Sequence, residues 1–309
     1  MIVVAGEALI DLVPQGPGAL ADLKPALGGG PYNTAVALGR LGSPHRLLLP
    51  GRPPTRFGEA LLDGLRRAGV DVSGGAARPG ADDARGGHDR RHGIGRLLLL
   101  CRRHRRPSVH RSRRAARRYA RAVSFGTCSL VLEPGASAYE ELIARGGRAG
   151  GCSPRSTPHI RAGLIPDADA YRARFKSWLP SVTLLKLSAE DAAWLGGSPR
   201  AWLAAGPAAV VVTRGGDGLT VFTRDGGEYS VPGEKVDVVD TIGAGDTVNA
   251  ALLHGLAVQN ALSAEALAAL GAEGWTRLLR FAARAAAITC SRAGAEPPYA
   301  AELGEPTAL

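Results

Sequence analysis

A glycine-rich turn that opens a helix constrains the fold of this 309-residue chain most. Residues 240–250 read DTIGAGDTVNA, and the helical pattern that they open runs to Val258. Two glycines separated by one small residue let the backbone approach a ligand closely. The free N–H groups of a helix's first turn and the helix dipole both favour negative charge at that point. The pattern therefore predicts that Gly243, Ala244 and Gly245 form an anion hole suited to a transferring phosphoryl group.

Asp246 lies inside the first turn of that helix, where the dipole favours the ionised carboxylate. A carboxylate beside an anion hole can accept the proton of an attacking hydroxyl group, which makes Asp246 the candidate general base. The simpler alternative is a glycine-rich helix start in which the aspartate only helps to cap the helix. A bare GxGD pattern would favour that alternative, whereas the full run is far more specific.

Strands and helices alternate along much of the chain, most regularly from Arg161 onward. Such alternation favours a mainly parallel sheet that is covered by helices on both faces. A chain of this length can form one large α/β domain, and we expect one over residues 1–309. The predicted strands include residues 2–5, 209–213 and 218–223, and the predicted helices include residues 32–41, 57–69, 190–195, 243–258 and 278–290.

Two further segments strengthen the assignment of the C-terminal motif. Residues 28–42 read GGGPYNTAVALGRLG, a glycine turn followed by an asparagine and a helix, and residues 6–11 read GEALID. Together with residues 240–250, they resemble the signatures of the ribokinase-like (PfkB) carbohydrate kinases. The resemblance implies a three-layer α/β sandwich with a mostly parallel central sheet and a small β lid. It also implies transfer of the γ-phosphoryl group of ATP to a sugar hydroxyl, with Asp246 as the base.

The resemblance points to residues that would hold the sugar. The family's opening strand supplies an aspartate, and its glycine turn and asparagine face the sugar, which implies roles for Asp11, Gly29 and Asn33. Taken alone, Asp11 could be a strand-end carboxylate at the surface, and Asn33 could be a helix N-cap. The stretches GEALIDL and KLSAED look most like those of fructokinases. Ribokinases and other sugar or nucleoside kinases are the alternative.

Residues 211–218, which read VVTRGGDG, resemble the strand and turn that carry the nucleotide in this family. The resemblance places Thr213, Gly215 and Gly218 near the phosphates and ribose of ATP. A plain hairpin turn would explain the adjacent glycines equally well.

Residues 186–191, which read KLSAED, fall where the family has an N-x-x-E motif that helps to order the metal and the phosphates. Here Ser188 replaces the asparagine and Asp191 replaces the glutamate, with Glu190 as a neighbouring candidate. Ser188 and Asp191 could equally form a capping box at a helix start. Mg²⁺ would be held mainly by nucleotide phosphates and water. A monovalent cation such as K⁺ would lie against the backbone around Asp240 and Ile242.

The net charge of +10 raises the question of a nucleic-acid partner. Between Gly74 and Arg121 lie 15 arginines, three aspartates and no lysine, a local charge of +12, so the rest of the chain carries −2. The sequence has no zinc-finger spacing, RNP-like motif or basic zipper. These features argue against a nucleic-acid-binding function.

Three stretches depart from the family pattern and are rich in Arg, Gly, Pro, His and Ser, namely residues 45–56, 74–121 and 145–159. Family sequence resumes in register after each of them. GC-rich codons read in a shifted frame encode this composition, so we hypothesise local frame shifts; a divergent, disordered basic insertion is the alternative. We expect residues 74–121 to be mobile, the lid to be malformed and sugar kinase activity to be weakened. The alternative of another class is an inactive, partly disordered product whose basic stretch binds polyanions.

The N-terminus reaches Glu7 before an apolar run of signal length forms, and no apolar run approaches the roughly 18 residues of a membrane helix. The four cysteines are scattered and include no CxxC pair, which is typical of a reducing compartment. We therefore expect a cytoplasmic protein without a membrane partner. The resemblance also implies that two copies of the chain could form a homodimer through the lid.

Overall fold

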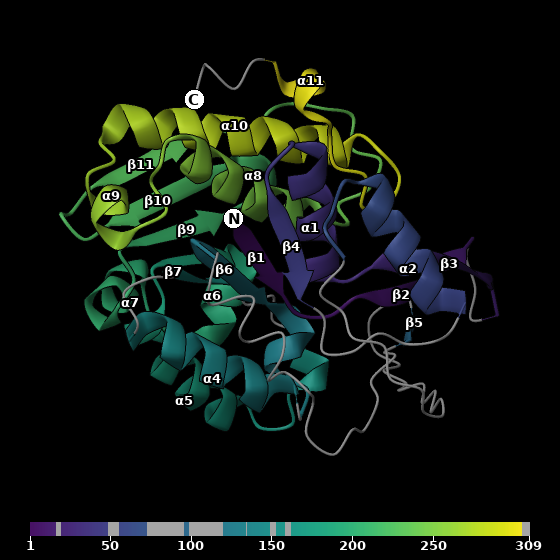
Figure 1. The fold of residues 1–309 in the computed structure, drawn as a ribbon, viewed down its shortest axis with the longest axis horizontal. Coiled ribbons are helices and arrows are strands. Elements are labelled where there is room, and N and C mark those ends of the chain that lie inside the picture. Colours follow the sequence, from purple (N-terminus) through teal and green to yellow (C-terminus); the bar gives the residue numbers. More distant parts are fainter. Residues whose placement is uncertain are drawn as a thin grey trace.

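The structure is a computed structural model that describes residues 1–16, 20–48, 56–72, 96–98, 120–133, 135–148, 153–157 and 162–304. A central eight-stranded sheet lies between two layers of helices, and a smaller three-stranded sheet projects from one side (Figure 1). This is the three-layer α/β arrangement with a small second sheet that the sequence predicted.

The central sheet is mostly parallel. Its strands follow the order β11 (Glu228–Val231), β10 (Leu219–Thr223), β9 (Ala209–Thr213), β8 (Leu184–Ser188), β7 (Ser153–Thr157), β6 (Ala122–Gly126), β1 (Ile2–Ala5) and β4 (His45–Leu48). The six strands from β9 to β4 pair in parallel, and β10 and β11 add antiparallel pairs at one edge. Buried apolar runs such as Ile2–Ala5 are typical of strands that are covered on both faces.

The smaller sheet has the strand order β3 (Asp22–Gly28), β2 (Leu9–Gln15) and β5 (Arg96–Leu98), and all its pairs are antiparallel. It occupies the place of the predicted β lid, beside α2 in Figure 1. Of the stretch 74–121, for which we predicted mobility, β5 and residues 120–121 are described; the rest lies outside the described residues.

One face of the central sheet, called here the α8 face, packs against α1 (Gly30–Arg40), α2 (Arg56–Arg67), α8 (Ala244–Val258) and α10 (Ala272–Cys290). The shorter helices α9 (Ala264–Ala268) and α11 (Ala300–Leu303) follow α8 and α10 in the chain. Leu252 of α8 and Trp275 of α10 are fully buried in this layer. Positive φ angles at Gly42 and Gly69 accompany the ends of α1 and α2, as their sequence positions predicted.

The opposite face, called here the α5 face, packs against α4 (Gly135–Arg148), α5 (Ala168–Trp178), α6 (Ala189–Leu195) and α7 (Pro199–Ala205). Short 3₁₀ turns lie at η1 (Thr127–Leu130), η2 (Ala162–Leu164), η3 (Leu179–Ser181) and η4 (Gly215–Asp217). Edge-to-face aromatic contacts dominate this core, with Phe175 packed against Trp178 and Trp202 at centroid distances of 6.1 and 6.0 Å.

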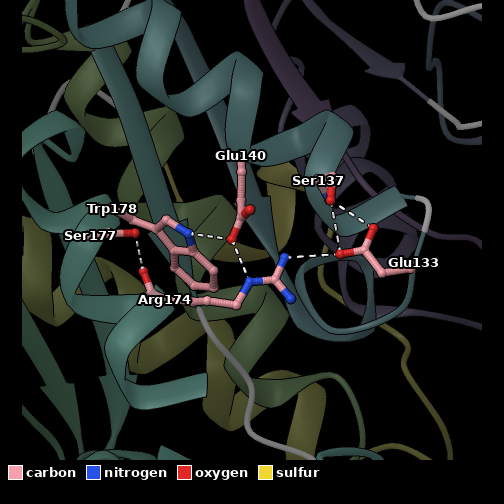
Figure 2. Close-up of polar contacts among 6 residues, drawn as sticks. All are labelled: Glu133, Ser137, Glu140, Arg174, Ser177 and Trp178. Carbon is pink, nitrogen blue, oxygen red and sulfur yellow. Dashed lines mark hydrogen bonds and ion pairs between the residues drawn. The ribbon is translucent and has the colours of Figure 1, made fainter. Parts of the chain in front are cut away.

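A polar network joins α4 to α5 on the outside of this layer (Figure 2). Glu140 Oε1 accepts hydrogen bonds from Arg174 Nε and Trp178 Nε1, each at 2.8 Å. Arg174 also reaches Glu133, whose carboxylate accepts from Ser137 at the start of α4. The hydrogen bond to Glu140, more than any other effect, raises the pKa of the Arg174 guanidinium. The network therefore fixes the two helices against each other.

Two of the irregular stretches nevertheless supply strands of the central sheet. His45–Leu48 forms β4, which pairs with β1, and Ser153–Thr157 forms β7 between β6 and β8. Neither stretch has the apolar alternation of a buried strand, so their pairing comes from the neighbouring strands rather than from local pattern. Among the helices that the structure describes, none is both long and apolar enough to cross a membrane.

Candidate active site

Helix α8 begins at a turn that favours glycine. Gly243 is the N-cap, with φ 78° and ψ −6°, and no side chain caps the helix. A Cβ at this position would come within 2.6 Å of the Cβ of Ala295, so the neighbouring chain also excludes a larger residue. The first N–H groups of a helix have no acceptor inside it. The Ala244 N–H donates to the Thr241 carbonyl oxygen at 3.3 Å, so the Gly245 amide is the donor that the positive end of this 15-residue helix offers to an anion.

Asp246 is buried in this first turn, with 7% of its surface exposed. Its Oδ2 accepts a hydrogen bond of 2.9 Å from Nδ2 of Asn33, which lies in α1 and is itself buried. Thr34 Oγ1 lies 3.5 Å from the Asp246 carbonyl oxygen and donates to it. A buried carboxylate needs such donors to offset the loss of water. The packing of α1 on α8 thus brings together two predicted site residues that lie 213 positions apart.

The glycine turn before α1 joins Asp11 to the same region. Gly29 has φ 105°, caps α1, and its carbonyl oxygen accepts the Asn33 N–H at 2.8 Å. Asp11 lies on β2, and its Oδ2 occupies the space directly over Gly28, where a Cβ would be 2.1 Å away. The close approach explains the glycine at position 28. The predicted site residues therefore form a series of neighbours from the lid sheet to the start of α8, namely Asp11, Gly29, Asn33 and Asp246.

Three polar residues behind Asp246 were not singled out from the sequence. Asn249 Nδ2 donates to Ser124 Oγ at 3.1 Å and lies 3.4 Å from Thr34 Oγ1. All three are buried, and with Asp246 they line a small cavity between α1, β6 and α8. The available signal was Ser124 itself, a polar residue inside the otherwise apolar strand AVSFG. This network fixes the first turns of α8 to the sheet.

Ser188 and Asp191 form the capping box at the start of α6 that the sequence offered as an alternative. The Asp191 N–H donates to Ser188 Oγ at 3.0 Å, and Asp191 Oδ2 accepts from the Ser188 N–H at 3.4 Å. Glu190 is exposed. Among the described residues, no three His, Cys, Asp or Glu side chains gather as a metal site would require.

The nucleotide candidates lie at the carboxyl ends of β8 and β9. Thr213 pairs in register with Ser188, and its hydroxyl lies 3.4 Å from the Leu187 carbonyl oxygen. Gly215 has φ 55° and open space where a Cβ would be, so it leaves room beside the strand ends. Gly218 differs, because a Cβ there would lie 2.0 Å from the Val231 carbonyl oxygen. The hairpin packing by itself therefore requires glycine at position 218.

Asp240 fixes the loop that leads into α8. Its Oδ1 accepts the Ile242 N–H at 3.0 Å, and its Oδ2 accepts the Gly294 N–H at 2.9 Å. The Asp240 N–H and the Val239 N–H both donate to the Cys290 carbonyl oxygen. These bonds hold two backbone segments side by side at the helix start. They fix the backbone at Asp240 and Ile242, where the sequence predicted a monovalent cation.

Lys186, the first residue of the KLSAED stretch, is a further charged residue, and the sequence assigned no role to it. Lys186 lies in β8 and is 2% exposed, among the most deeply buried large side chains of the described chain. Burial lowers the pKa of its ammonium group, while the charges of Asp246 and then Asp191 raise it. Both of these carboxylates are site candidates, so Lys186 belongs to the same electrostatic environment.

Comparisons with known proteins show which family the chain belongs to. Residues 105–301 match the model of the pfkB family carbohydrate kinases. The chain belongs to this family. A fructokinase from Rhizobium leguminosarum bv. trifolii is 33% identical over 289 residues, which cover 87% of this chain and 84% of the relative. Fructokinase-2 from Zea mays is 31% identical over 281 residues, which cover 85% of this chain and 82% of that relative.

Solved structures show the same fold. A fructokinase from Xylella fastidiosa with bound ATP superposes with a TM-score of 0.78 at 25% identity, covering 98% of this chain and 97% of that one. A sugar kinase from Pyrococcus horikoshii in complex with ATP superposes with a TM-score of 0.79 at 23% identity, covering 98% and 96%. The predicted ribokinase-like architecture is confirmed.

Proposed function

We propose that this PfkB family member is an ATP-dependent sugar kinase and that its sugar is fructose. The observation that carries the proposal is the buried Asp246 at the open start of α8, which Asn33 holds at 2.9 Å. A base beside the positive end of a helix suits transfer of a phosphoryl group to a hydroxyl. Several of the similar proteins are named fructokinases, which supports the choice of sugar.

In this reaction Asp11, Gly29 and Asn33 bind the sugar and present one hydroxyl to Asp246. Asp246 takes the hydroxyl proton while the sugar oxygen forms a bond to the γ-phosphorus of ATP. The bond from that phosphorus to the β,γ-bridging oxygen breaks, and ADP leaves with the electron pair. The turn of residues 243–245 and the positive end of α8 face the negative charge that builds up on the transferred group, with the Gly245 amide as donor.

The ATP phosphates would lie along the ends of β8 and β9, near Ser188, Thr213 and Gly215, with Gly218 completing the turn. When bound, Mg²⁺ supplies charge neutralisation on the phosphates. Asp191, whose carboxylate is half-buried at the start of α6, fits an indirect role through water, and the exposed Glu190 fits such a role less well. The Asp240 carboxylate fixes the backbone at Ile242 and Gly294, beside the anion hole. The backbone around Asp240 and Ile242 is therefore the candidate site for K⁺.

We further propose that residues 1–309 act as one kinase domain, that the lid sheet of β2, β3 and β5 is the surface of a homodimer, and that the protein is cytosolic. The first two rest on the family pattern and the last on the scattered cysteines. Sedimentation of the protein, and of a variant with a charge placed on β2, tests the dimer.

A coupled ATP assay with fructose, ribose and adenosine tests the function. We expect turnover with fructose at the highest kcat/KM and a fall in turnover of about 10²–10⁴-fold in Asp246→Asn. A preference for ribose or adenosine would assign the chain to another branch of the family. Absence of turnover on all three, together with DNA binding that weakens steeply with salt, would favour the polyanion-binding alternative instead.

A further inference from the structure

Lys186 is an exception among the lysines of this chain. The sequence contains four, and Lys24, Lys176 and Lys235 are exposed, whereas Lys186 is 2% exposed within the apolar strand LLKLS. Taking an ammonium group out of water is costly unless opposite charges compensate it. An apolar residue would fill the same position of the strand without that cost. The lysine therefore calls for an explanation in terms of its neighbours.

The strand geometry sets the direction of the side chain. Successive strand residues point to opposite faces, and Leu185 and Leu187 pack in the core of the α5 face. Leu184 packs in the core of the α8 face, so Lys186 points to that face as well. It therefore projects toward the layer that contains Asp246, at the carboxyl end of the sheet where the site residues gather.

The charged groups around this position are mostly carboxylates. From α8 and α6, Asp246 and Asp191 act on the Lys186 ammonium, and both favour its charged form against the effect of burial. Glu190 on α6 is exposed to solvent. Lys186 is thus a buried cation on the same face of the central sheet as the candidate base.

We propose that Lys186 is a positioning residue for the candidate base, whose buried ammonium group compensates Asp246 and Asp191 and keeps Asp246 ionised before the substrates bind. This proposal rests on the proposed kinase function for its meaning. After Asp246 has taken the hydroxyl proton, the Lys186 ammonium group remains positively charged. Its positive potential then favours the negative charge that passes to ADP.

Carbon NMR of the full-length protein labelled at lysine Cε tests this inference directly, because only four signals are expected. Lys186→Met identifies the signal of Lys186, and Lys186→Arg serves the same purpose if the methionine variant does not fold. We expect Lys186 to be charged at pH 7.5 in the wild type. In Asp246→Asn its titration midpoint should fall by about one pH unit or more, and in Asp191→Asn by less.

Asp169→Asn is the matched control, since Asp169 lies on α5 and pairs with Arg172 at the surface. It should leave the Lys186 midpoint unchanged. The proposal is overturned if the midpoint is the same in the wild type and in Asp246→Asn, or if Lys186 is uncharged at pH 7.5. Neither readout needs kinase activity, so a failed sugar assay leaves this test intact.

The activity of the charge variant supplies a second test. In Lys186→Met the acid limb of the kcat profile should move upward by about one pH unit, and Lys186→Arg should restore part of the shift. A purely structural lysine would lower the amount of folded enzyme without moving that limb. An unmoved limb in a folded variant would therefore contradict the positioning role.

Discussion

The two faces of the central sheet differ in what they bury. The α8 face buries polar and charged groups, among them Asn33, Ser124, Lys186, Asp246 and Asn249, and each has neighbours of matching polarity. The α5 face buries aromatic side chains in edge-to-face contact, and the side chains of its ion pairs, drawn in Figure 2, are partly exposed.

This difference separates chemistry from stability within one domain. Buried polar networks are costly unless satisfied, so they are expected where a reaction needs fixed dipoles and charges. Apolar and aromatic packing contributes mainly to the free energy of folding. Substitutions in the polar network around Asp246 on the α8 face should therefore change turnover per folded molecule, and those in the aromatic core of the α5 face should change stability.

The largest effect is expected for Asp246→Asn on the α8 face. The substitution preserves shape and the hydrogen bond with Asn33 can be replaced, but the base is removed. Proton transfer to a positioned base contributes about 10²–10⁴-fold, so kcat should fall by that factor with ATP affinity retained. Steady-state kinetics and calorimetric ATP titration measure both quantities. Undiminished kcat would exclude Asp246 as the base and would remove the distinction between the faces.

Phe175→Ala should show the opposite behaviour on the α5 face. Phe175 is 2% exposed and contacts both Trp178 and Trp202, so the substitution leaves a cavity. Such changes cost about 3–5 kcal/mol of unfolding free energy. Urea denaturation should show this loss, while kcat per folded molecule stays within about twofold. A large loss of kcat in folded protein would show that the two faces are coupled.

Acid should destabilise the α8 face through two buried histidines. Burial lowers the pKa of His45 and of His254, whose Nδ1 lies 2.7 Å from Ser43 Oγ. Both are then neutral in the folded protein but gain protons on unfolding below their ordinary pKa of about 6.5. Stability should be full above that pH and decline below it, by up to about 1.4 kcal/mol per pH unit for each histidine.

Urea midpoints measured between pH 8 and 5 test this slope. His254→Gln keeps a polar side chain at this position of α8. It should reduce the loss of unfolding free energy per pH unit by the contribution of that one histidine. An unchanged slope in this variant would show that His254 already carries a proton in the folded state.

The smallest effect is expected for Glu140→Gln in the network of Figure 2. Glutamine keeps an acceptor for Trp178 Nε1 but loses the charge that pairs with Arg174. Because both side chains are partly exposed, the loss should stay near 1 kcal/mol and shrink at high salt. Urea denaturation at two salt concentrations measures it. Glu273→Gln, which breaks the exposed pair with Arg277, is the control and should cost less.

Local sequence determined the parts of the fold whose pattern is strong. The glycine turn and the following apolar run specified the start and extent of α8, since a positive φ at Gly243 and an unbroken helical period leave few alternatives. The runs at β1 and β9 were similarly predictable, because buried parallel strands are continuously apolar. The capping box of Ser188 and Asp191 follows from four residues of sequence.

Only the tertiary structure decided which distant residues meet. Nothing in the sequence spacing relates Asn33 to Asp246, or Ser124 to Asn249, and these pairs form because α1, α8 and β6 pack together. The strand role of Ser153–Thr157 likewise depends on the neighbours β6 and β8, since its own residues have weak strand preference. The environment of Lys186 is another case: its place in an apolar strand is local, but the carboxylates that compensate its charge come from other elements. Burial and charge pairing are properties of the packed chain, and a single sequence encodes them only through the fold.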